Sequence, residues 1–313
     1  MRMFLLSQAP LLILIALCGT FAVMSPRFMS WQNVANILQQ SSSGAIVAAG
    51  MVFVLLTGGI DLSAGSGMFL GAAILGTLVL AGYSTAVAVV AALVAGPLCG
   101  LVHGGLITRG QMSPFVVTMS SLFILRGSGL WLTRTQAINL PESFTQFASR
   151  SVLGLPLTVW LAAATILLGH YVLNRTAFGR QVLAVGHDPA TARKAGVNVS
   201  GIVVAVYVIS GLCAALGGLT ALAQLGAVSP TFGRDREFDA VAAAVLGGTS
   251  LFGGRGNVFP GAVVGAMIVV VVFNGLNIIN ANPYIYPLIT GSVILLAVLL
   301  DSLRRRQPAG GRA

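Results

Sequence analysis

The side chains able to carry out acid–base or metal chemistry are few and scattered in this chain. Its histidines, His103, His170 and His187, lie in three segments without HExxH spacing. Its cysteines, Cys18, Cys99 and Cys213, lie in separate apolar runs. An enzyme or metal site needs such groups to converge, and no GxxxxGKS or GxxxxGKT loop is present to cradle ATP phosphates. We therefore predict no catalytic residues, no metal site and no cofactor bound by this chain.

The carboxylates are equally sparse. The seven acids are Asp61, Glu142, Asp188, Asp235, Glu237, Asp239 and Asp301, and none falls near the middle of an apolar span. An ion-coupled carrier usually places carboxylates at membrane depth. Asp61 is the best candidate for one, but it also suits the N-cap of the helix that follows, alone or with Ser63. We favour the cap.

Polar side chains inside apolar segments are candidates for a solute path. Asn36, Gln39, Gln40 and Ser43 share one helical face by i+3 and i+4 spacing, and Asn274 and Asn277 form a second i,i+3 pair. Hydrogen bonding between helices is the alternative role of these groups. Phe115 and Thr118 are weaker path candidates and also suit packing.

Arg126 falls inside an apolar span, where a charge needs a partner. We expect carbonyls at a helix end or an acid to meet it. Asp61 qualifies only if its loop reaches into the membrane, and an anchoring role is favoured over contact with a ligand.

Composition identifies the elements that position these residues. Charged residues make up 8% of the 313 residues and hydrophobic ones 56%, against about 25% charged in soluble domains. We predict an all-α polytopic membrane bundle of about ten spans, or nine if the short eighth segment is re-entrant. The expected spans are 5–24, 33–57, 66–82, 85–107, 114–133, 156–173, 202–226, 237–248, 259–279 and 284–301.

The distribution of basic residues orients this bundle. Eleven are expected on the side of the N-terminus, namely Arg2, Arg109, Arg175, Arg180, Arg193, Lys194, Arg255, Arg304, Arg305, Arg306 and Arg312. The five expected on the other side are Arg27, Arg134, Arg150, Arg234 and Arg236. The positive-inside rule then places both termini in the cytoplasm. We expect one transmembrane domain, 1–303, and a basic tail, 304–313. The net charge of +10 reflects topology, not nucleic-acid binding.

The cytoplasmic loop 174–201 is the most informative connection. Asp188 and Pro189 suit a helix start, and Gly196 can end the element. We expect a short helix with small side chains between them. Such a helix can dock in a partner's groove, or simply connect two spans.

Two glycine-rich segments resemble each other at an offset of 189 residues. Gly58, Gly59, Leu62, Gly65 and Gly67 match residues 247, 248, 251, 254 and 256. Six predicted spans separate the segments, which indicates a weak parallel internal repeat. Glycine-interrupted segments in two halves point to a transport pathway, and a tight turn between packed helices is the alternative.

From about Trp31 to Asp301 the chain resembles the permease subunits of bacterial ATP-binding-cassette (ABC) importers for monosaccharides, of the ribose, xylose and galactose type. The most specific element is TGGIDLSAGS at 57–66, close to the family's TGGIDLSVGS. Supporting elements are PFVVT at 114–118, LRG at 125–127, the loop 174–201, and DAVAA at 239–243 leading into LGGTS at 246–250.

This resemblance implies the translocation path of an importer in the bacterial inner membrane. The partners would be an ABC ATPase, which uses ATP and Mg²⁺, an extracytoplasmic sugar-binding protein and a second permease copy or paralogue. It implies that the motif residues Gly58, Gly59, Asp61, Ser63, Gly65 and Arg126 belong to a gating loop. The implied ATPase contact comprises Gly186, His187, Asp188, Pro189, Ala190, Ala192, Arg193 and Gly196. The family often has Gly-Asn where this chain has His187 and Asp188.

Two other functions stay open at this point. An ion-driven carrier for a small polar solute, or an ABC permease for a solute other than a sugar, would share this composition. Branched-chain amino-acid permeases are related, although their usual segment at Asp61 differs. The residues do not reveal which sugar is carried or whether the partner permease is identical.

Overall fold

Apolar runs that begin at serine or proline form most of the helices. Ser30 caps α3 (Trp31–Leu56) by accepting a hydrogen bond from the backbone N–H of Asn33. Ser84 caps α5 (Thr85–Thr108) in the same way. Pro114 opens α6 (Pro114–Thr133) as expected, at a position where its missing N–H costs little. Each of these helix starts follows from the local sequence.

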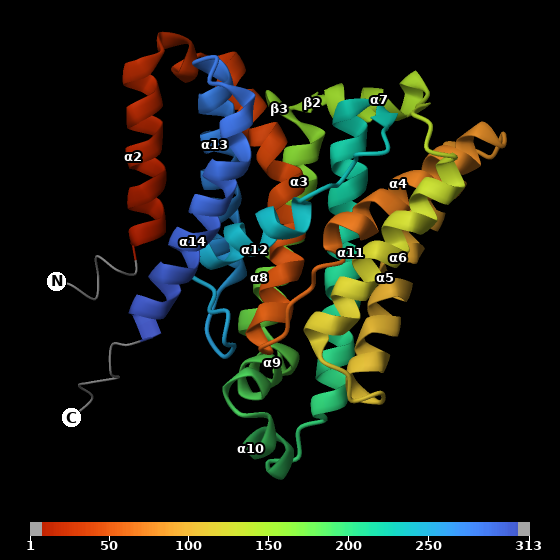
Figure 1. The fold of residues 1–313 in the computed structure, drawn as a ribbon, viewed down its shortest axis with the longest axis vertical. Coiled ribbons are helices and arrows are strands. Elements are labelled where there is room, and N and C mark those ends of the chain that lie inside the picture. The colour runs from red at the N-terminus through yellow and green to blue at the C-terminus, as the bar shows by residue number, and fades with distance from the viewer. Residues whose placement is uncertain (1–7, 306–313) are drawn as a thin grey trace.

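The computed structural model describes residues 8–305, so most of the predicted basic tail lies outside the described residues (Figure 1). The other helices are α2 (Ala9–Met24), α4 (Ala64–Leu80), α7 (Glu142–Ser149), α8 (Leu157–Arg175), α9 (Ala177–His187), α10 (Pro189–Lys194), α11 (Val199–Leu225), α12 (Arg236–Leu246), α13 (Val263–Ile278) and α14 (Tyr286–Arg305). Single turns occur at η1 (Pro26–Met29), η2 (Val258–Ala262) and η3 (Pro283–Ile285).

Two small antiparallel pairings lie in the connections, which the all-α expectation did not include. Strand β1 (Ile138–Asn139) pairs with β4 (Ala227–Val228), with Ile138 opposite Val228. Strand β2 (Ser151–Val152) pairs with β3 (Leu155–Pro156). Both pairings lie at the upper end of the bundle in Figure 1, opposite α9 and α10.

The polytopic helical membrane fold is confirmed, since a helix lies in every predicted span. Within the described residues, six helices have the length and hydropathy to cross a membrane, and α2 and α4 are shorter apolar helices. Helix α12 has 11 residues, or about 16 Å at 1.5 Å per residue. That is about half of a 30 Å hydrocarbon core, so the predicted span 237–248 does not cross on its own.

Helix α3 forms the centre of the bundle. From residue 41 to residue 56 every position is buried except the half-buried Gly44. It packs against α8, α11, α12 and α13, and α2 and α14 lie at one edge of the bundle with α5 and α6 at the other (Figure 1). A helix buried on all sides is apolar all round, and only the N-terminal third of α3 carries the amides seen in the sequence.

Helices α5 and α11 approach closely through glycines spaced four residues apart. A Cβ on Gly100 would collide with the carbonyl of Tyr207, and one on Gly96 with the carbonyl of Gly211. Gly104 packs in the same way against Val204. Small residues at this spacing let membrane helices pack backbone to backbone, so this pairing fixes α11 against the rest of the bundle.

This packing predicts opposite effects for two glycines of α5. Gly100→Ala forces the two backbones apart and should lower stability by about 1–3 kcal/mol. Gly105→Ala is the matched control, since no atom lies within 4 Å of its added Cβ, and alanine favours a helix by about 1 kcal/mol over glycine. Thermal unfolding in detergent measures both, and equal melting temperatures for the two variants would contradict the packing.

Candidate functional site

The loop that follows α3 carries the glycine-rich motif at 57–66 and is folded into the bundle. Asp61 is 2% exposed. Its Oδ1 accepts hydrogen bonds from the backbone N–H of Ser63 at 3.0 Å and from the hydroxyl of Ser63 at 2.6 Å. Its Oδ2 accepts one from the hydroxyl of Ser210 on α11 at 2.7 Å. The carboxylate therefore joins this loop to a distant helix.

The adjacent carbonyl makes two further connections. The carbonyl oxygen of Ile60 accepts from the hydroxyl of Tyr207 at 3.1 Å and from the hydroxyl of Thr118 at 3.2 Å. These bonds bring α6 and α11 onto the same loop. We call Ile60, Asp61, Ser63, Thr118, Tyr207 and Ser210 the Asp61 cluster.

The Asp61 cluster lies at membrane depth. Ser210 is 11 residues beyond Val199, where α11 begins, or about 16 Å along the helix. In Figure 1 the chain turns back upward after α3, and α4 starts halfway up the bundle. The N-cap residue of α4 is Ser63, without a side-chain capping bond. Ser63 therefore takes the N-cap position that the sequence assigned to Asp61 alone or with Ser63, and Asp61 supports it by accepting the N–H of Ser63.

Glycines of the motif permit this fold. Gly58 adopts a φ of +76°, which only glycine takes up freely. A Cβ on Gly59 would press on the Tyr207 hydroxyl. A Cβ on Gly65 would collide with the Glu237 carboxylate and the Gly233 carbonyl. The start of α4 thus meets the start of α12 within the bundle.

Glu237 lies at this meeting point and is 4% exposed. Its Oε2 has no hydrogen-bond partner within residues 8–305. The N-terminal ends of α4 and α12 both carry partial positive charge, which favours a carboxylate there.

Arg126 anchors the same junction from α6. Its guanidinium donates to the Phe232 carbonyl at 2.6 Å and lies over the Phe69 ring, 4.7 Å from the centroid. A carbonyl was one of the partners expected, but Asp61 is not bonded to Arg126. The Asp61 carboxylate is instead committed to Ser63 and Ser210.

The predicted path residues are not brought together into one group. Ser43 donates to the Gly217 carbonyl at 2.7 Å, and Thr118 belongs to the Asp61 cluster. Asn274 exchanges amide hydrogen bonds with Asn33 at 2.9 and 3.0 Å. Of the others, Gln39 is half-buried, and the exposed ones are Asn36, Gln40, Phe115 and Asn277.

Three residues that form these hydrogen bonds were not identified from the sequence. Asn33 was missed because it lies at the edge of its span. Tyr207 and Ser210 are polar residues at i,i+3 spacing within an apolar helix, the pattern that singled out Asn274 and Asn277. Applied to α11, that signal would have found both residues.

The loop 174–201 contains two helices, of which the sequence predicted the second, α10. Asp188 caps it by accepting from the N–H groups of Ala190 at 2.8 Å and Thr191 at 3.2 Å. Pro189 is its first residue and Gly196, at a φ of +84°, follows its end. Within α10 itself, Ala192 is buried and Arg193 is exposed. The expected start, stop and small-residue face are confirmed.

Helices α9 and α10 lie beneath the bundle and contact its lower end (Figure 1). A Cβ on Gly186 would collide with the Leu56 carbonyl, at the end of α3, and with the backbone nitrogen of Gly254. That nitrogen donates to the same carbonyl at 2.9 Å. The ring of His187 lies against Gly254. The two glycine-rich segments that resemble each other in sequence thus meet at this contact.

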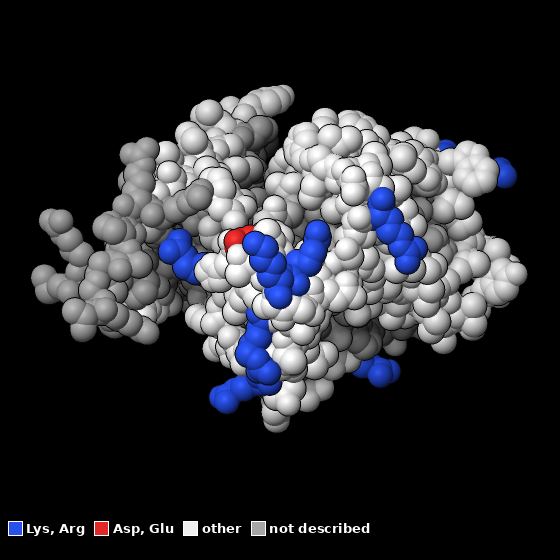
Figure 2. Space-filling model, turned by 90° about the horizontal axis from the view of Figure 1, so that it is seen from below, with Lys and Arg blue, Asp and Glu red and all other residues white. Residues whose placement is uncertain are grey.

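Basic side chains dominate the face seen from below (Figure 2). The exposed basic residues of α8 to α10 and of the neighbouring loops are Arg109, Arg175, Arg180, Arg193, Lys194 and Arg255. A surface of one charge attracts partners of the opposite charge, so this end of the bundle suits an acidic protein surface.

Comparison with known proteins covers nearly the whole chain. Residues 33–299 match the family described as "Branched-chain amino acid transport system / permease component". The chain is 38% identical over 309 residues to the ribose import permease protein RbsC of Escherichia coli (strain K12), covering 97% of this chain and 96% of that protein. It is 37% identical over 314 residues to the fructose import permease protein FrcC of Rhizobium meliloti, covering 97% and 87%. No solved structure gives a significant match.

The capping bonds of α10 generate a pH-dependent prediction. Hydrogen bonds from the Thr191 hydroxyl and from the backbone of Thr191 and Ala190 lower the pKa of the Asp188 carboxyl. The cap is therefore fully present above the usual aspartate pKa of about 4. It is lost as the pH falls through the lower pKa of the folded state. Amide exchange at Ala190 and Thr191, corrected for intrinsic rates, should be flat from pH 7 to about 4 and rise below.

Variants of Asp188 provide the control for this measurement. Asp188→Ala should speed exchange of both amides about five-fold at pH 7, whereas Asp188→Ser, which keeps a capping oxygen, should preserve most of the protection. Equal exchange in the two variants would show that the cap does not hold α10.

Proposed function

The chain belongs to the family of transport-system permease components, and from this premise we propose that it forms the path by which an ABC importer carries a monosaccharide across the bacterial inner membrane. The observation that carries this proposal is the match over nearly the full length of permeases named for the import of ribose and fructose. A relative named for D-allose transport is 33% identical over 294 residues. The chain is a multi-pass membrane protein and the translocation subunit of a sugar importer.

The energy for transport comes, in this proposal, from a separate ATPase that binds ATP and Mg²⁺. Helix α10 is the docking element, with Arg193 and Lys194 exposed at its end. ATP-driven movement of the ATPase would push α10, and the contact of Gly186 with Leu56 would pass that push to the end of α3. The loop of the Asp61 cluster follows directly from that point. Coupling requires that the nucleotide state favour one of two arrangements of the bundle.

The finer topology is part of the same proposal. We propose ten membrane segments, with α12 as a half-length one, and both termini in the cytoplasm on the same side as α10. The excess of basic residues at the lower end supports this orientation. The domain division, one transmembrane domain over 1–303 with a basic tail, and the weak parallel repeat belong to the same proposal. A second permease and an extracytoplasmic sugar-binding protein complete the importer.

An ion-coupled carrier is the second candidate, since Asp61 lies at membrane depth. Both carboxylate oxygens of Asp61 are engaged by the hydroxyls of Ser63 and Ser210. That arrangement suits a structural contact better than a carboxylate that binds and releases an ion on every cycle.

Reconstitution tests the proposed function. The chain is placed in proteoliposomes with a sugar-system ABC ATPase and a sugar-binding protein from the same organism, and uptake of labelled D-ribose, D-fructose, D-allose and D-galactose is measured. Uptake of at least one sugar should require ATP, the ATPase and the binding protein together. Equal uptake without any ATPase, or uptake that a protonophore abolishes while ATP is held constant, would contradict the proposal.

Charge reversal tests the docking element separately. Arg193→Glu with Lys194→Glu should weaken binding of the ATPase by about ten-fold or more, because lost charge pairs at a docking surface weaken association. Arg150→Glu with Arg134→Glu makes the same charge change at the opposite end of the bundle and should leave binding unchanged. Co-purification of the ATPase with each variant measures the effect, and equal loss in both pairs would exclude α10 as the specific contact.

A further inference from the structure

The start of α12 concentrates charge at a depth where lipid offers no partner. Five of the 24 charged residues of the chain fall within six positions, 234–239. The sequence predicts that the arginines of this segment lie on the outer side of the membrane as topological charges. In the structure the segment descends into the bundle to begin α12 (Figure 1).

The depth of this segment follows from its neighbours. Arg236 and Asp239 line a small pocket with Ser43 of α3 and Val270 of α13. Ser43 is 12 residues from the start of α3 and 13 from its end, or about 18 and 20 Å. The pocket is thus level with the middle of α3. Arg236 and Asp239 therefore lie near mid-height of the bundle, away from both of its ends.

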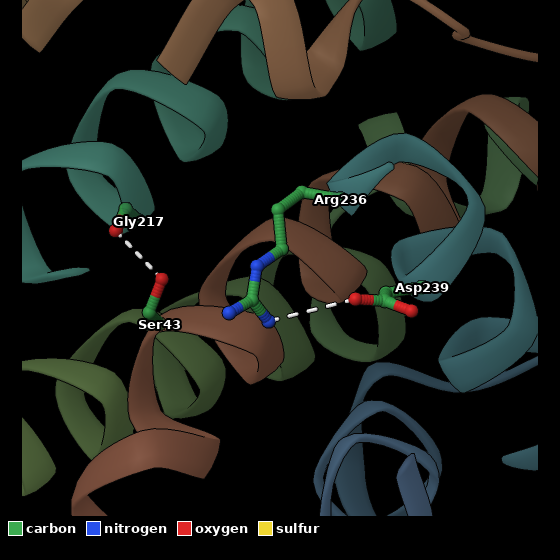
Figure 3. Close-up of polar contacts among 4 residues, drawn as sticks. All are labelled: Ser43, Gly217, Arg236 and Asp239. Carbon is green, nitrogen blue, oxygen red and sulfur yellow. Dashed lines mark hydrogen bonds and ion pairs between the residues drawn. The ribbon is translucent and has the colours of Figure 1, made fainter. Parts of the chain in front are cut away.

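Arg236 and Asp239 form an ion pair that remains open to the outside of this chain. Arg236 Nη1 lies 3.5 Å from Asp239 Oδ2, and their side chains are 50% and 20% exposed. Figure 3 shows the guanidinium of Arg236 extending between Ser43 and Asp239. A half-exposed guanidinium at this height of a membrane bundle would be costly against lipid, so such residues face protein or a water-filled cavity.

We propose that Arg236 and Asp239 form the hydrogen-bonding contact for sugar hydroxyls halfway along the translocation path, and that a second copy of this chain completes the site. The inference rests on the proposed function and names the residues that serve it.

The chemistry of the pair matches an uncharged polyol. Its net charge is zero, so it has no preference for an ionic solute. A sugar hydroxyl can donate to the carboxylate of Asp239 while it accepts from the guanidinium of Arg236. The pair is an i,i+3 contact that is partly exposed, which makes it a weak one. A hydroxyl can therefore take the place of the partner charge as the sugar passes.

The size of the pocket shows why a second copy is needed. The cavity beside Arg236 has a volume of about 20 Å³, room for about one water molecule. A sugar cannot be enclosed there by one chain. The same face of a second copy, related by two-fold symmetry, would present a second Arg236 and Asp239 across the path.

Uptake kinetics test the assignment in the reconstituted complex. With labelled D-ribose, D-fructose, D-allose and D-galactose as probes, Asp239→Asn should lower the maximal uptake rate about ten-fold, the effect of losing one charge-assisted hydrogen bond. The dependence on binding-protein concentration should stay unchanged, because that step precedes the path. Arg236→Lys should retain more uptake than Arg236→Gln.

Asp235→Asn is the matched control. It makes the same chemical change four residues earlier, at a φ of +64° that asparagine tolerates, and its uptake should stay within about two-fold of wild type. If the wild type takes up a sugar and Asp239→Asn takes it up at the same rate, the inference is overturned and the proposed function stays intact. Failure of the wild type on all four sugars would overturn the proposed function instead.

Thiol labelling tests the site without relying on transport. In a background lacking Cys18, Cys99 and Cys213, Asp239→Cys should react with a charged, membrane-impermeant methanethiosulfonate at least about ten-fold faster than Leu168→Cys, since the thiolate is the reactive form and needs water. Leu168 is a 64% exposed apolar position on α8. Addition of sugar-loaded binding protein together with ATP should slow the labelling of the cysteine at position 239. Equal rates at the two positions would overturn the inference.

Discussion

The fold depends on one constraint, which is that backbone polar groups inside a bilayer must be satisfied by the protein itself. The chain leaves helical geometry between α3 and α4, at the depth of the middle of α11. The exposed carbonyl of Ile60 is met by the hydroxyls of Tyr207 and Thr118. Asp61 satisfies the N–H of Ser63 and binds Ser210. Without these partners the loop could not remain at that depth.

The Asp61 cluster determines where two shortened helices begin. Because the loop turns back within the bundle, α4 starts halfway up and its first turn meets the first turn of α12. Gly65 and Gly233 allow the two backbones to approach closely, and Arg126 holds the segment before α12 through the Phe232 carbonyl. The lower end of the loop lies beside Leu56, which contacts Gly186 and Gly254. One continuous set of contacts thus joins α10 to the polar interior.

The sequence predicted the helices well and the depth of the loops poorly. Hydropathy located a helix in every expected span, and capping rules placed α10 correctly between Asp188 and Gly196, because these signals are local. The height of the Asp61 loop within the bundle was not predicted, because a linear count of spans assigns every connection to one surface of the membrane. Re-entry is decided by distant partners such as Ser210, which no local pattern ties to Asp61. The role of the path residues stays a prediction, and for Asn274 the structure shows the alternative role, a hydrogen bond between helices to Asn33, 241 residues away.

The most direct test of the Asp61 cluster is a double-mutant cycle between Asp61 and Ser210. Asp61→Ala, Ser210→Ala and the double variant are unfolded in mixed micelles, and the free energies of unfolding are compared. If the two residues bond directly, the free energy of unfolding lost in the double variant should be smaller than the sum of the two single losses. The difference should be about 1 kcal/mol or more. Losses that add to within about 0.5 kcal/mol would show that the two residues do not meet. That result would place Asp61 in a turn at the membrane surface.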